Sequence, residues 1–375
     1  MPMSTAKRLL IATTVPVTLR AFLLPYADHF RGAGWTVDAM AAGSSSEAAL
    51  AEHFDSVIDV DWSRNPLAPR NFGDTPKHVR EAVRRGGYDI VHVHTPVAAF
   101  VTRYALRNRP PGGPKVVYTA HGFHFHRGGQ ELRNTVFRTL EQAAGRWTDR
   151  LVVINREDQE AALRYRIVPE ERLSFMPGIG LDFSLYDASK VERGDVLRLR
   201  EKLGLHERDA LFAMIAAFNP GKRHKDAIAA LAAMGADGTR VHIAFAGDGP
   251  LRKETEERAS ALGIRKRTHF LGELGDIRPL VVASAATLVP SEREGLSRAA
   301  MESVCLGVPV IGADARGVRD VAKDGRGLLF PTGDPLALRD AMLGIVETPF
   351  RPAPPDPAWR IENLIAAHEA LYDRL

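Results

Sequence analysis

Short runs of apolar and β-branched residues recur along the chain and alternate with longer stretches in which apolar residues follow a helical spacing. In the first half, such runs cover residues 8–14, 35–41, 56–62, 89–95, 115–121, 149–155 and 173–180. In the second half, they cover residues 210–217, 241–247, 268–273, 285–291, 308–314 and 325–331. Strands that alternate with helices are typical of βαβ units, whose parallel sheets are covered on both faces. The pattern therefore predicts an α/β protein with two sheets of six or seven strands.

Two segments interrupt this alternation. The first is the polar stretch LDFSLYDASKVERGDV, and the second is the proline-rich stretch TPFRPAPPDPAW, which cannot continue a helix. The residues after the prolines again have apolar side chains at helical spacing. A chain of 375 residues also exceeds what one core usually covers. We therefore predict a first parallel-sheet domain over residues 1–182, a second over 183–352, and a tail over 353–375 whose helix packs back on the first domain.

The composition and the cysteine count limit the cellular compartments in which we expect the protein. Hydrophobic residues make up 45% and charged residues 26% of the chain, as in ordinary globular proteins. Cys305 is the only cysteine, so a disulfide within the chain is excluded, which fits a reducing cytoplasm. The N-terminal apolar run is too short for a signal peptide, and no window holds about 18 apolar residues. We expect a cytoplasmic protein, with peripheral contact to the cytoplasmic face of the membrane as an open alternative.

The net charge of +4 is mildly basic and compatible with anionic ligands or an anionic membrane surface. Basic clusters occur at 84–85, 222–225 and 264–267, but they are short. Aromatic residues do not interleave with them, as they would in a nucleic-acid interface. Nucleic acid is therefore not an expected partner.

One stretch combines acidic residues with a strand–helix–strand pattern. SEREGLSRAAMESVCLGVPVIGAD, residues 291–314, reads as a loop, a helix starting after Ser297 and a strand after Gly307. The loop would lie at the carboxyl end of a parallel strand, where open α/β sheets bind ligands. Free amides at the start of the helix attract phosphate oxygens. Glu294 and Glu302 would then flank a bound phosphate.

Carboxylates repel phosphate but accept hydrogen bonds from vicinal hydroxyls. A ligand with hydroxyls on either side of a diphosphate is a nucleotide-sugar, so Glu294 and Glu302 indicate that class. The alternative is that Glu302 is a solvated helix residue and Glu294 a loop charge. The glycine turn AGDGP, with Gly247 and Gly249, would let the backbone approach the nucleotide, although a plain turn is an equal reading.

Several motifs in the same order resemble those of retaining glycosyltransferases of family 4, which have the GT-B fold of two facing Rossmann-like domains. EGLSRAAMESVCLGVPVI resembles the E-x7-E segment of that family. Other motifs resemble its capsule and exopolysaccharide branch: PLAPRNF, TAHGFHFHRG, VVINREDQEAA, MPGIGLD, AGDGPLR, FLGELGDI and ADARGVRDVAKDGRGLLFPTGD. The resemblance extends over nearly the whole chain.

The resemblance implies roles for residues of the second half. Glu302 matches the glutamate that holds the ribose, Glu294 the one that holds donor-sugar hydroxyls, and Lys222 the basic residue on the donor phosphates. Further donor contacts are implied for Gly249, Leu274, Leu296, Ser297 and Arg298. Family members often have a polar residue where this chain has Ala217, so Arg223, Arg298 or Arg316 would have to assist Lys222, or activity would be weakened.

For the first half, the resemblance implies that His121 is a catalytic residue beside the donor sugar or acceptor. Arg20, His94 and Phe123 are assigned to the acceptor side. The histidines of HGFHFH could suggest a metal, but no carboxylate sits at ligand spacing, so we expect no metal and no other cofactor. A glycine-rich phosphate loop is missing after the first strand, which disfavours a dehydrogenase.

Together these features predict a retaining, metal-independent glycosyltransferase that uses a nucleoside-diphosphate sugar, either a UDP-hexose or a UDP-N-acetylhexosamine. The acceptor would be a saccharide, a lipid-linked glycan or a small molecule. Two alternatives stay open. A sugar-nucleotide epimerase would bind the same donor but release an isomerised nucleotide-sugar, and a non-catalytic subunit, suggested by Ala217, would bind without turnover.

Overall fold

The computed structural model describes residues 6–63, 65, 68–235, 238–348 and 350–375. The chain forms two compact units. Unit 1 contains the residues up to Gly180 together with Ile361–Leu375, and unit 2 contains Leu181–Arg360. The predicted boundary after residue 182 lies two residues beyond this division. The segment predicted as a single tail, 353–375, is shared between the units, because only its helix belongs to unit 1.

Unit 1 is built on a seven-stranded sheet in the order β3-β2-β1-β4-β5-β6-β7. Every neighbouring pair in it is parallel. Its strands are β1 (Arg8–Ala12), β2 (Thr36–Ala41), β3 (Ser56–Asp59), β4 (Ile90–His94), β5 (Lys115–Ala120), β6 (Arg150–Val153) and β7 (Leu173–Phe175). Its helices are α1 (Pro16–Thr18), α2 (Leu24–Gly32), α3 (Asp74–Gly86), α4 (Pro96–Ala105), α5 (Glu131–Gly145), α6 (Arg156–Arg164) and α14 (Ile361–Tyr372).

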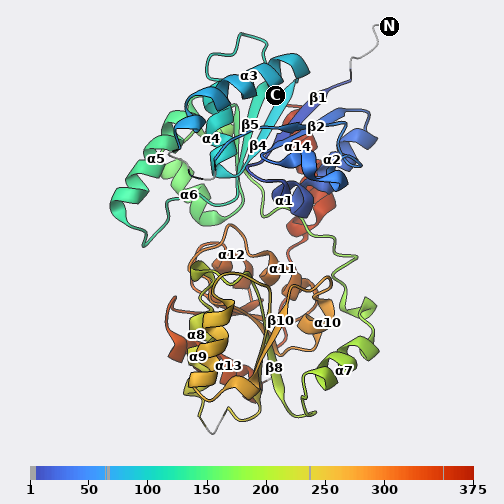
Figure 1. Cartoon of the computed structure of the whole chain (residues 1–375), viewed down its shortest axis with the longest axis vertical. Helices are drawn as coiled ribbons and strands as arrows, with labels where there is room; N and C mark the ends of the chain where they lie inside the picture. The colour runs from blue at the N-terminus through green and yellow to red at the C-terminus, as the bar shows by residue number, and fades with distance from the viewer. Residues whose placement is uncertain (1–5, 64, 66–67, 236–237, 349) are drawn as a thin grey trace. The chain divides into compact units, whose positions relative to one another are not determined.

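Alternate residues of these strands enter two different cores. Leu9 and Ile11 of β1 pack on one face with α2 and α14, whereas Leu10 and Ala12 pack on the other face with α3 and α4. This is the consequence of side chains pointing to opposite faces of a strand. Because helices cover both faces (Figure 1), the strands are apolar on both sides, as parallel sheets require.

Unit 2 has a six-stranded sheet in the order β10-β9-β8-β11-β12-β13, and its neighbouring strands are parallel. Its strands are β8 (Ala210–Ile215), β9 (Val241–Ala246), β10 (Thr268–Gly272), β11 (Ala286–Val289), β12 (Val310–Ala313) and β13 (Gly327–Phe330). Its helices are α7 (Arg193–Lys202), α8 (His224–Ala233), α9 (Arg252–Ala261), α10 (Arg278–Val282), α11 (Arg298–Cys305), α12 (Val318–Ala322) and α13 (Pro335–Glu347).

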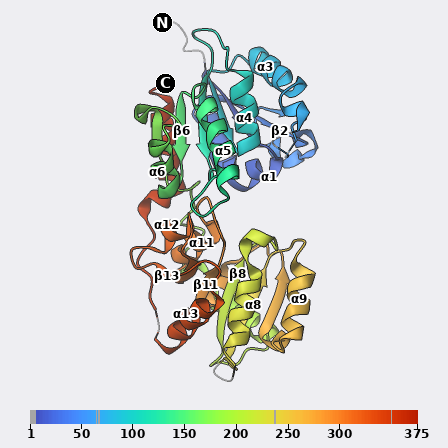
Figure 2. The ribbon, with the colours of Figure 1, turned by 90° about the vertical axis from the view of Figure 1, so that its left-hand side faces the viewer.

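Two layers of helices enclose this second sheet. Helices α8, α9 and α13 pack on one face, which is turned towards the viewer in Figure 2, and α7 and α10 lie on the opposite side (Figure 1). Since all strands are parallel, their carboxyl ends share one edge of the sheet, and the loops after β8, β9, β10, β11 and β12 emerge there together. Every candidate donor residue lies in one of these loops or in the helix that follows it.

The C-terminal helix α14 completes the core of unit 1. Leu364 and Leu371 are buried in the same cluster as Leu9 and Ile11, and the Tyr372 ring lies 5.2 Å from that of Phe30. Burial of each such leucine contributes about 1.5–3 kcal/mol. The last helix of the chain therefore stabilises the first strand.

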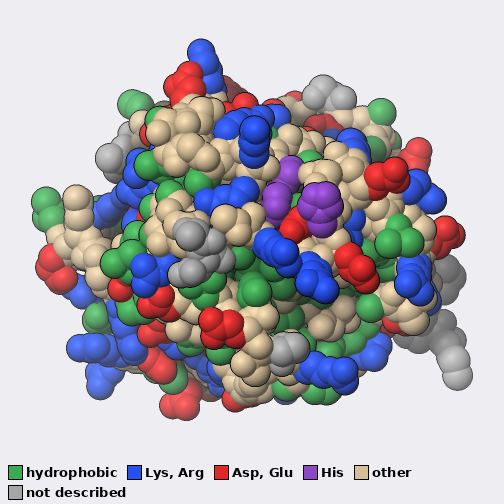
Figure 3. All heavy atoms as spheres, turned by 90° about the horizontal axis from the view of Figure 1, so that it is seen from below, with side chains coloured by type: hydrophobic (Ala, Val, Ile, Leu, Met, Phe, Trp, Pro, Cys, Tyr) green, Lys and Arg blue, Asp and Glu red, His purple; other side chains and the backbone are tan. Residues whose placement is uncertain are grey.

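The surface of the molecule mixes charges of both signs. On the face drawn in Figure 3, basic and acidic side chains are interspersed, without a continuous basic stripe. Within the described part of the chain, none of the helices is both long and apolar enough to span a membrane.

Candidate functional site

The helix that carries the acidic pattern starts and ends close to the predicted positions. Ser297 is the N-cap residue of α11, and Gly307 follows the helix with a φ of 71°. The Ser297 side chain makes no capping hydrogen bond. The first amides of α11 are therefore not satisfied by this side chain, and amides at a helix N-terminus can bind an anion.

Glu302 lies in the second turn of α11 and is only 6% exposed. Its Oε1 atom accepts a hydrogen bond of 2.6 Å from the Tyr186 hydroxyl and one of 2.7 Å from Arg298 Nε. Burial and the neighbouring Glu302 carboxylate raise the pKa of Tyr186 to about 12, so this phenol remains a donor. Among the described residues, both side-chain hydrogen bonds to Glu302 use Oε1, so Oε2 can accept from a ligand hydroxyl.

Sequence reasoning did not find Tyr186. It belongs to the segment between β7 and α7, 116 residues before Glu302, and no motif spacing connects the two positions. Arg298 could be found, because its pairing with Glu302 is the ordinary i,i+4 contact of a helix.

The second carboxylate, Glu294, pairs with Lys222, the residue predicted to bind the donor phosphates. Lys222 Nζ and Glu294 Oε1 are 2.5 Å apart, and the Glu294 side chain is 15% exposed. Lys222 ends the short helical turn Pro220–Lys222 that follows β8, whereas Glu294 lies in the loop after β11. A backbone bond of 2.9 Å from Glu292 N to Gly221 O ties these two loops together.

A third loop fixes the backbone of Glu294. Glu294 N donates to Arg316 O at 3.0 Å, and Arg316 Nε donates to Glu294 O at 3.2 Å. Gly317 has a φ of 74°, and a Cβ there would lie 2.5 Å from Gly295 O. Glycine is therefore required at 317, because any other side chain would push the two loops apart.

The arginines expected to assist Lys222 have partners within unit 2. Arg223 pairs with Asp226 and Glu292, Arg298 with Glu302, and Arg316 with the Glu294 backbone. Ala217 is exposed at the end of β8 and adds no charge. Lys222 forms an ion pair with the Glu294 carboxylate.

The glycine turn after β9 packs against its own chain. Gly247 and Gly249 have φ values of 139° and 148°. Their Cβ atoms would lie 2.2 Å from Ala216 O and 2.8 Å from Phe218 N. The close approach that these glycines allow is therefore to the loop after β8. Leu274 and Leu296 are half-buried and pack against apolar clusters of unit 2, so a ligand contact there would involve mainly their backbone.

In unit 1, the predicted site histidines lie together, with His94 buried and His121 half-buried. His94 Nδ1 and His121 Nε2 are 2.9 Å apart. His92, on the same face of β4, contacts the Tyr372 hydroxyl at 2.5 Å and the Thr119 hydroxyl at 2.7 Å. Burial lowers the pKa of His121 to about 4 and that of His94 well below the usual value. His121 is thus a neutral hydrogen-bonding ring at neutral pH.

These histidines predict a pH dependence of stability. Burial also lowers the pKa of His368 to about 4, whereas an unfolded histidine titrates near 6.5. Below pH 6.5 the unfolded chain binds more protons, so stability falls as the pH drops towards 4, by about 2 kcal/mol at pH 5 for each of His121 and His368. We expect the melting temperature of unit 1 to fall by at least about 5 °C between pH 7 and pH 5.

Thermal melts of two variants test this prediction. His368→Met should reduce the acid sensitivity, whereas His78→Met, at an exposed position of α3, should keep it. Equal pH slopes for wild type and His368→Met would contradict the assignment.

Two residues assigned to the acceptor side have contacts within unit 1. Phe123 is 1% exposed and stacks on Phe125 with ring centres 4.9 Å apart, so its side chain lies in the core of unit 1. Arg20 is exposed on the π-helical segment Leu19–Leu23 and pairs with Glu47 at 3.0 Å. Among the described residues, no group of three or more histidines, cysteines or carboxylates could hold a metal ion.

Two Rossmann-like units with candidate residues on the carboxyl edges of their sheets define the GT-B class. A solved structure of that architecture, Anabaena Alr3699/HepE in complex with UDP and glucose, superposes with a TM-score of 0.74 at 19% identity and covers 98% of this chain and 95% of its own. The chain matches the family model described as Glycosyltransferase Family 4 over residues 22–178 and that described as Glycosyl transferases group 1 over residues 195–355.

Relatives in sequence show the family. The protein named "Putative glycosyltransferase EpsD" of Bacillus subtilis (strain 168) is 32% identical over 88% of this chain and 85% of its own length. The UDP-Gal:alpha-D-GlcNAc-diphosphoundecaprenol alpha-1,3-galactosyltransferase of Escherichia coli is 29% identical over 64% of this chain and 62% of its own. The chain belongs to the family 4 glycosyltransferases.

Proposed function

We propose that this glycosyltransferase moves a sugar from a UDP-sugar to a hydroxyl of a lipid-linked glycan, with retention of configuration and without a metal. The observation that carries the proposal is the arrangement around α11. Glu302 is anchored through Oε1 by Tyr186 and Arg298, and the Lys222–Glu294 pair joins the loops after β8 and β11 at the same edge of the sheet. Hydroxyl acceptors on either side of a phosphate site suit a nucleotide-sugar.

In this proposal, unit 2 holds the donor. Glu302 Oε2 accepts from the ribose, and the diphosphate lies at the amides of Leu296, Ser297 and Arg298 with Lys222 alongside. Backbone groups near Gly249 and Leu274 hold the base. Glu294 then exchanges Lys222 for a hydroxyl of the donor sugar, because the lysine is drawn to the more highly charged phosphate.

The chemical step is a displacement on one face of the sugar. The bond from the anomeric carbon to the β-phosphate oxygen breaks, the bond to the acceptor oxygen forms, and the acceptor proton passes to the departing phosphate. The chain contributes positioning and electrostatic stabilisation of the leaving diphosphate through Lys222. His121, assigned to the acceptor half, hydrogen-bonds as a neutral ring.

The donor and acceptor classes are supported by relatives. The Escherichia coli relative is named for UDP-Gal and a diphosphoundecaprenol-linked acceptor, and the solved neighbour binds UDP and glucose. We propose a UDP-hexose or UDP-N-acetylhexosamine as donor. A lipid-linked acceptor would bring the protein into peripheral contact with the membrane that contains it.

A donor panel tests the proposal. The purified protein is incubated with UDP-glucose, UDP-galactose and their N-acetylated forms, each with and without a polyprenyl-diphosphate sugar, and UDP release is followed. Release that increases with the acceptor is expected. An isomerised UDP-sugar formed without acceptor would indicate an epimerase, and tight UDP binding without any release would indicate a binding subunit; either result would overturn the transferase.

Activity should survive removal of divalent ions. Lys222 and the α11 amides are proposed to neutralise the diphosphate, which leaves no role for Mg²⁺ in charge compensation. We expect the initial rate in excess EDTA to stay within about twofold of the rate in magnesium buffer. A rate that disappears in EDTA and returns with Mg²⁺ or Mn²⁺ would contradict metal independence.

A further inference from the structure

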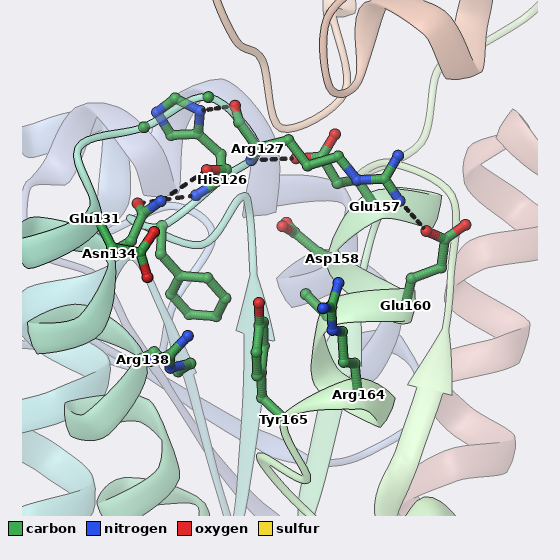
Figure 4. Close-up of a pocket in the computed structure, with 14 residues that line it drawn as sticks. His126, Arg127, Glu131, Asn134, Arg138, Glu157, Asp158, Glu160, Arg164 and Tyr165 are labelled. Carbon is green, nitrogen blue, oxygen red and sulfur yellow. Dashed lines mark hydrogen bonds and ion pairs between the residues drawn. The ribbon is translucent and has the colours of Figure 1, made fainter.

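A cavity of about 230 Å³ opens in unit 1 between α5, α6 and the loop that follows β5 (Figure 4). Its floor is formed by Phe125 and Tyr165, whose rings meet edge to face at 6.0 Å. The Tyr165 hydroxyl points into the cavity (Figure 4). The volume suits one small polar group or one sugar residue and is below that of sites for larger ligands.

Two arginines flank Tyr165 in this cavity. Figure 4 shows the phenol ring between Arg138 of α5 and Arg164 of α6, and the guanidinium carbons lie 4.7 Å and 5.5 Å from the ring centre. Within the described residues, neither arginine has an ion pair with a carboxylate. Cation–π contact orients a guanidinium but does not neutralise it. Both charges therefore remain available to a ligand.

The carboxylates that line the cavity are mostly engaged with other groups. Glu160 pairs with Arg127 at 2.6 Å, and Glu157 accepts from the Arg127 amide at 3.1 Å. Asp158 is 1% exposed and accepts from Asn155 Nδ2 at 2.8 Å and from Phe123 N at 3.1 Å. Glu160 is thus held in an ion pair, Glu157 and Asp158 are held by hydrogen bonds from amide groups, and the floor beside Tyr165 carries two arginines without a carboxylate ion-pair partner among the described residues. Glu131, at the exposed start of α5, is the remaining acid of the lining.

We infer that this cavity binds a phosphorylated saccharide. The phosphate would lie between Arg138 and Arg164, whose planar donors match phosphate oxygens, and would also accept from the Tyr165 hydroxyl. Sugar hydroxyls would donate to the carboxylates at the rim. This inference rests on the proposed function, which it extends: the cavity would hold the phosphate-bearing part of the acceptor, on the loop that starts at His121.

Binding of a simple probe to the full-length protein tests the site without any donor. Glucose 1-phosphate is titrated by calorimetry against wild type, Arg138→Gln and Arg164→Gln. Each variant should bind the probe about tenfold more weakly, because one charge-assisted contact is lost. Arg146→Gln is the matched control, since Arg146 caps the same helix α5 at an exposed position outside the cavity. It should bind as wild type does.

The remaining arms separate this site from the donor site. Lys222→Ala should not affect the cavity-dependent binding, so a loss of probe binding in Lys222→Ala but not in the two arginine variants would overturn the inference and leave the proposed function intact.

Glucose should bind far more weakly than glucose 1-phosphate; equal affinities would exclude a phosphate site. Inorganic phosphate should also bind more weakly than the sugar phosphate, and equal affinities would exclude the saccharide part. Arg164 is exposed, so its variant is expected to fold even if Arg138→Gln does not.

Discussion

Glu302→Ala should weaken UDP and UDP-sugar alike, by about ten- to a hundredfold in dissociation constant. Hydrogen bonds to a charged group contribute about 1.5–3 kcal/mol each, which corresponds to that range. The ribose is common to both ligands, so both should lose the same contact. Calorimetric titration of UDP and of an unreactive UDP-sugar measures the effect directly.

The structure supplies a control for this experiment. Removing Glu302 also leaves the Tyr186 hydroxyl and Arg298 without their acceptor, which could weaken binding through local disorder. Tyr186→Phe removes one bond to Glu302 but keeps the carboxylate, so its UDP affinity should fall by no more than a few fold. If Glu302→Ala bound UDP as wild type does, or if Tyr186→Phe reproduced its full loss, the ribose contact would be refuted.

Glu294→Ala should lower turnover without weakening UDP binding, in contrast to Glu302→Ala. Glu294 is proposed to hold the donor sugar, which UDP lacks, so UDP affinity should stay equal or rise as Lys222 is released from its partner. Turnover should fall by at least about a hundredfold, because the sugar must be held while its anomeric carbon gains positive charge. Steady-state kinetics with saturating acceptor gives kcat, and titration gives the UDP affinity.

Lys222→Ala provides the contrast for this second prediction. It removes the cation of the same pair and should weaken UDP, because the β-phosphate loses a charged partner. A Glu294→Ala protein that lost UDP affinity as strongly as Lys222→Ala would show that the glutamate acts by positioning the lysine rather than by holding the sugar.

The architecture could be predicted because each strand is a continuous apolar run between helical stretches. Strands buried on both faces, such as β1 and β4, leave that signature in the sequence. The order of the strands was not predicted. It depends on crossover contacts between residues far apart in the chain, such as Leu9 of β1 with Ile90 of β4.

The candidate site was predicted only where its parts are local. The start and stop signals of one helix predict the positions of Ser297, Glu302 and Gly307, and motifs indicate Lys222 and Glu294. The contacts that fix their side chains come from distant segments: Tyr186 on Glu302, Arg316 on Glu294, and Tyr372 on His92. The glycines of AGDGP were interpreted either as a close approach to the nucleotide or as a plain turn, and their backbone freedom allows a close contact with residues 216–218.

The place of α14 in unit 1 has a consequence for biosynthesis. Chains emerge from the ribosome N-terminus first, and domains usually fold in that order. Here Leu9 and Ile11 of the first strand pack against Leu364 and Leu371, which are synthesised only after the whole of unit 2. Unit 2 is synthesised in full before that cover exists, so it can finish folding while one face of the earlier sheet is still open to water. A ribosome that stalls before Ile361 would release a protein with a complete second unit and an exposed apolar face on the first, a form that chaperones and proteases recognise.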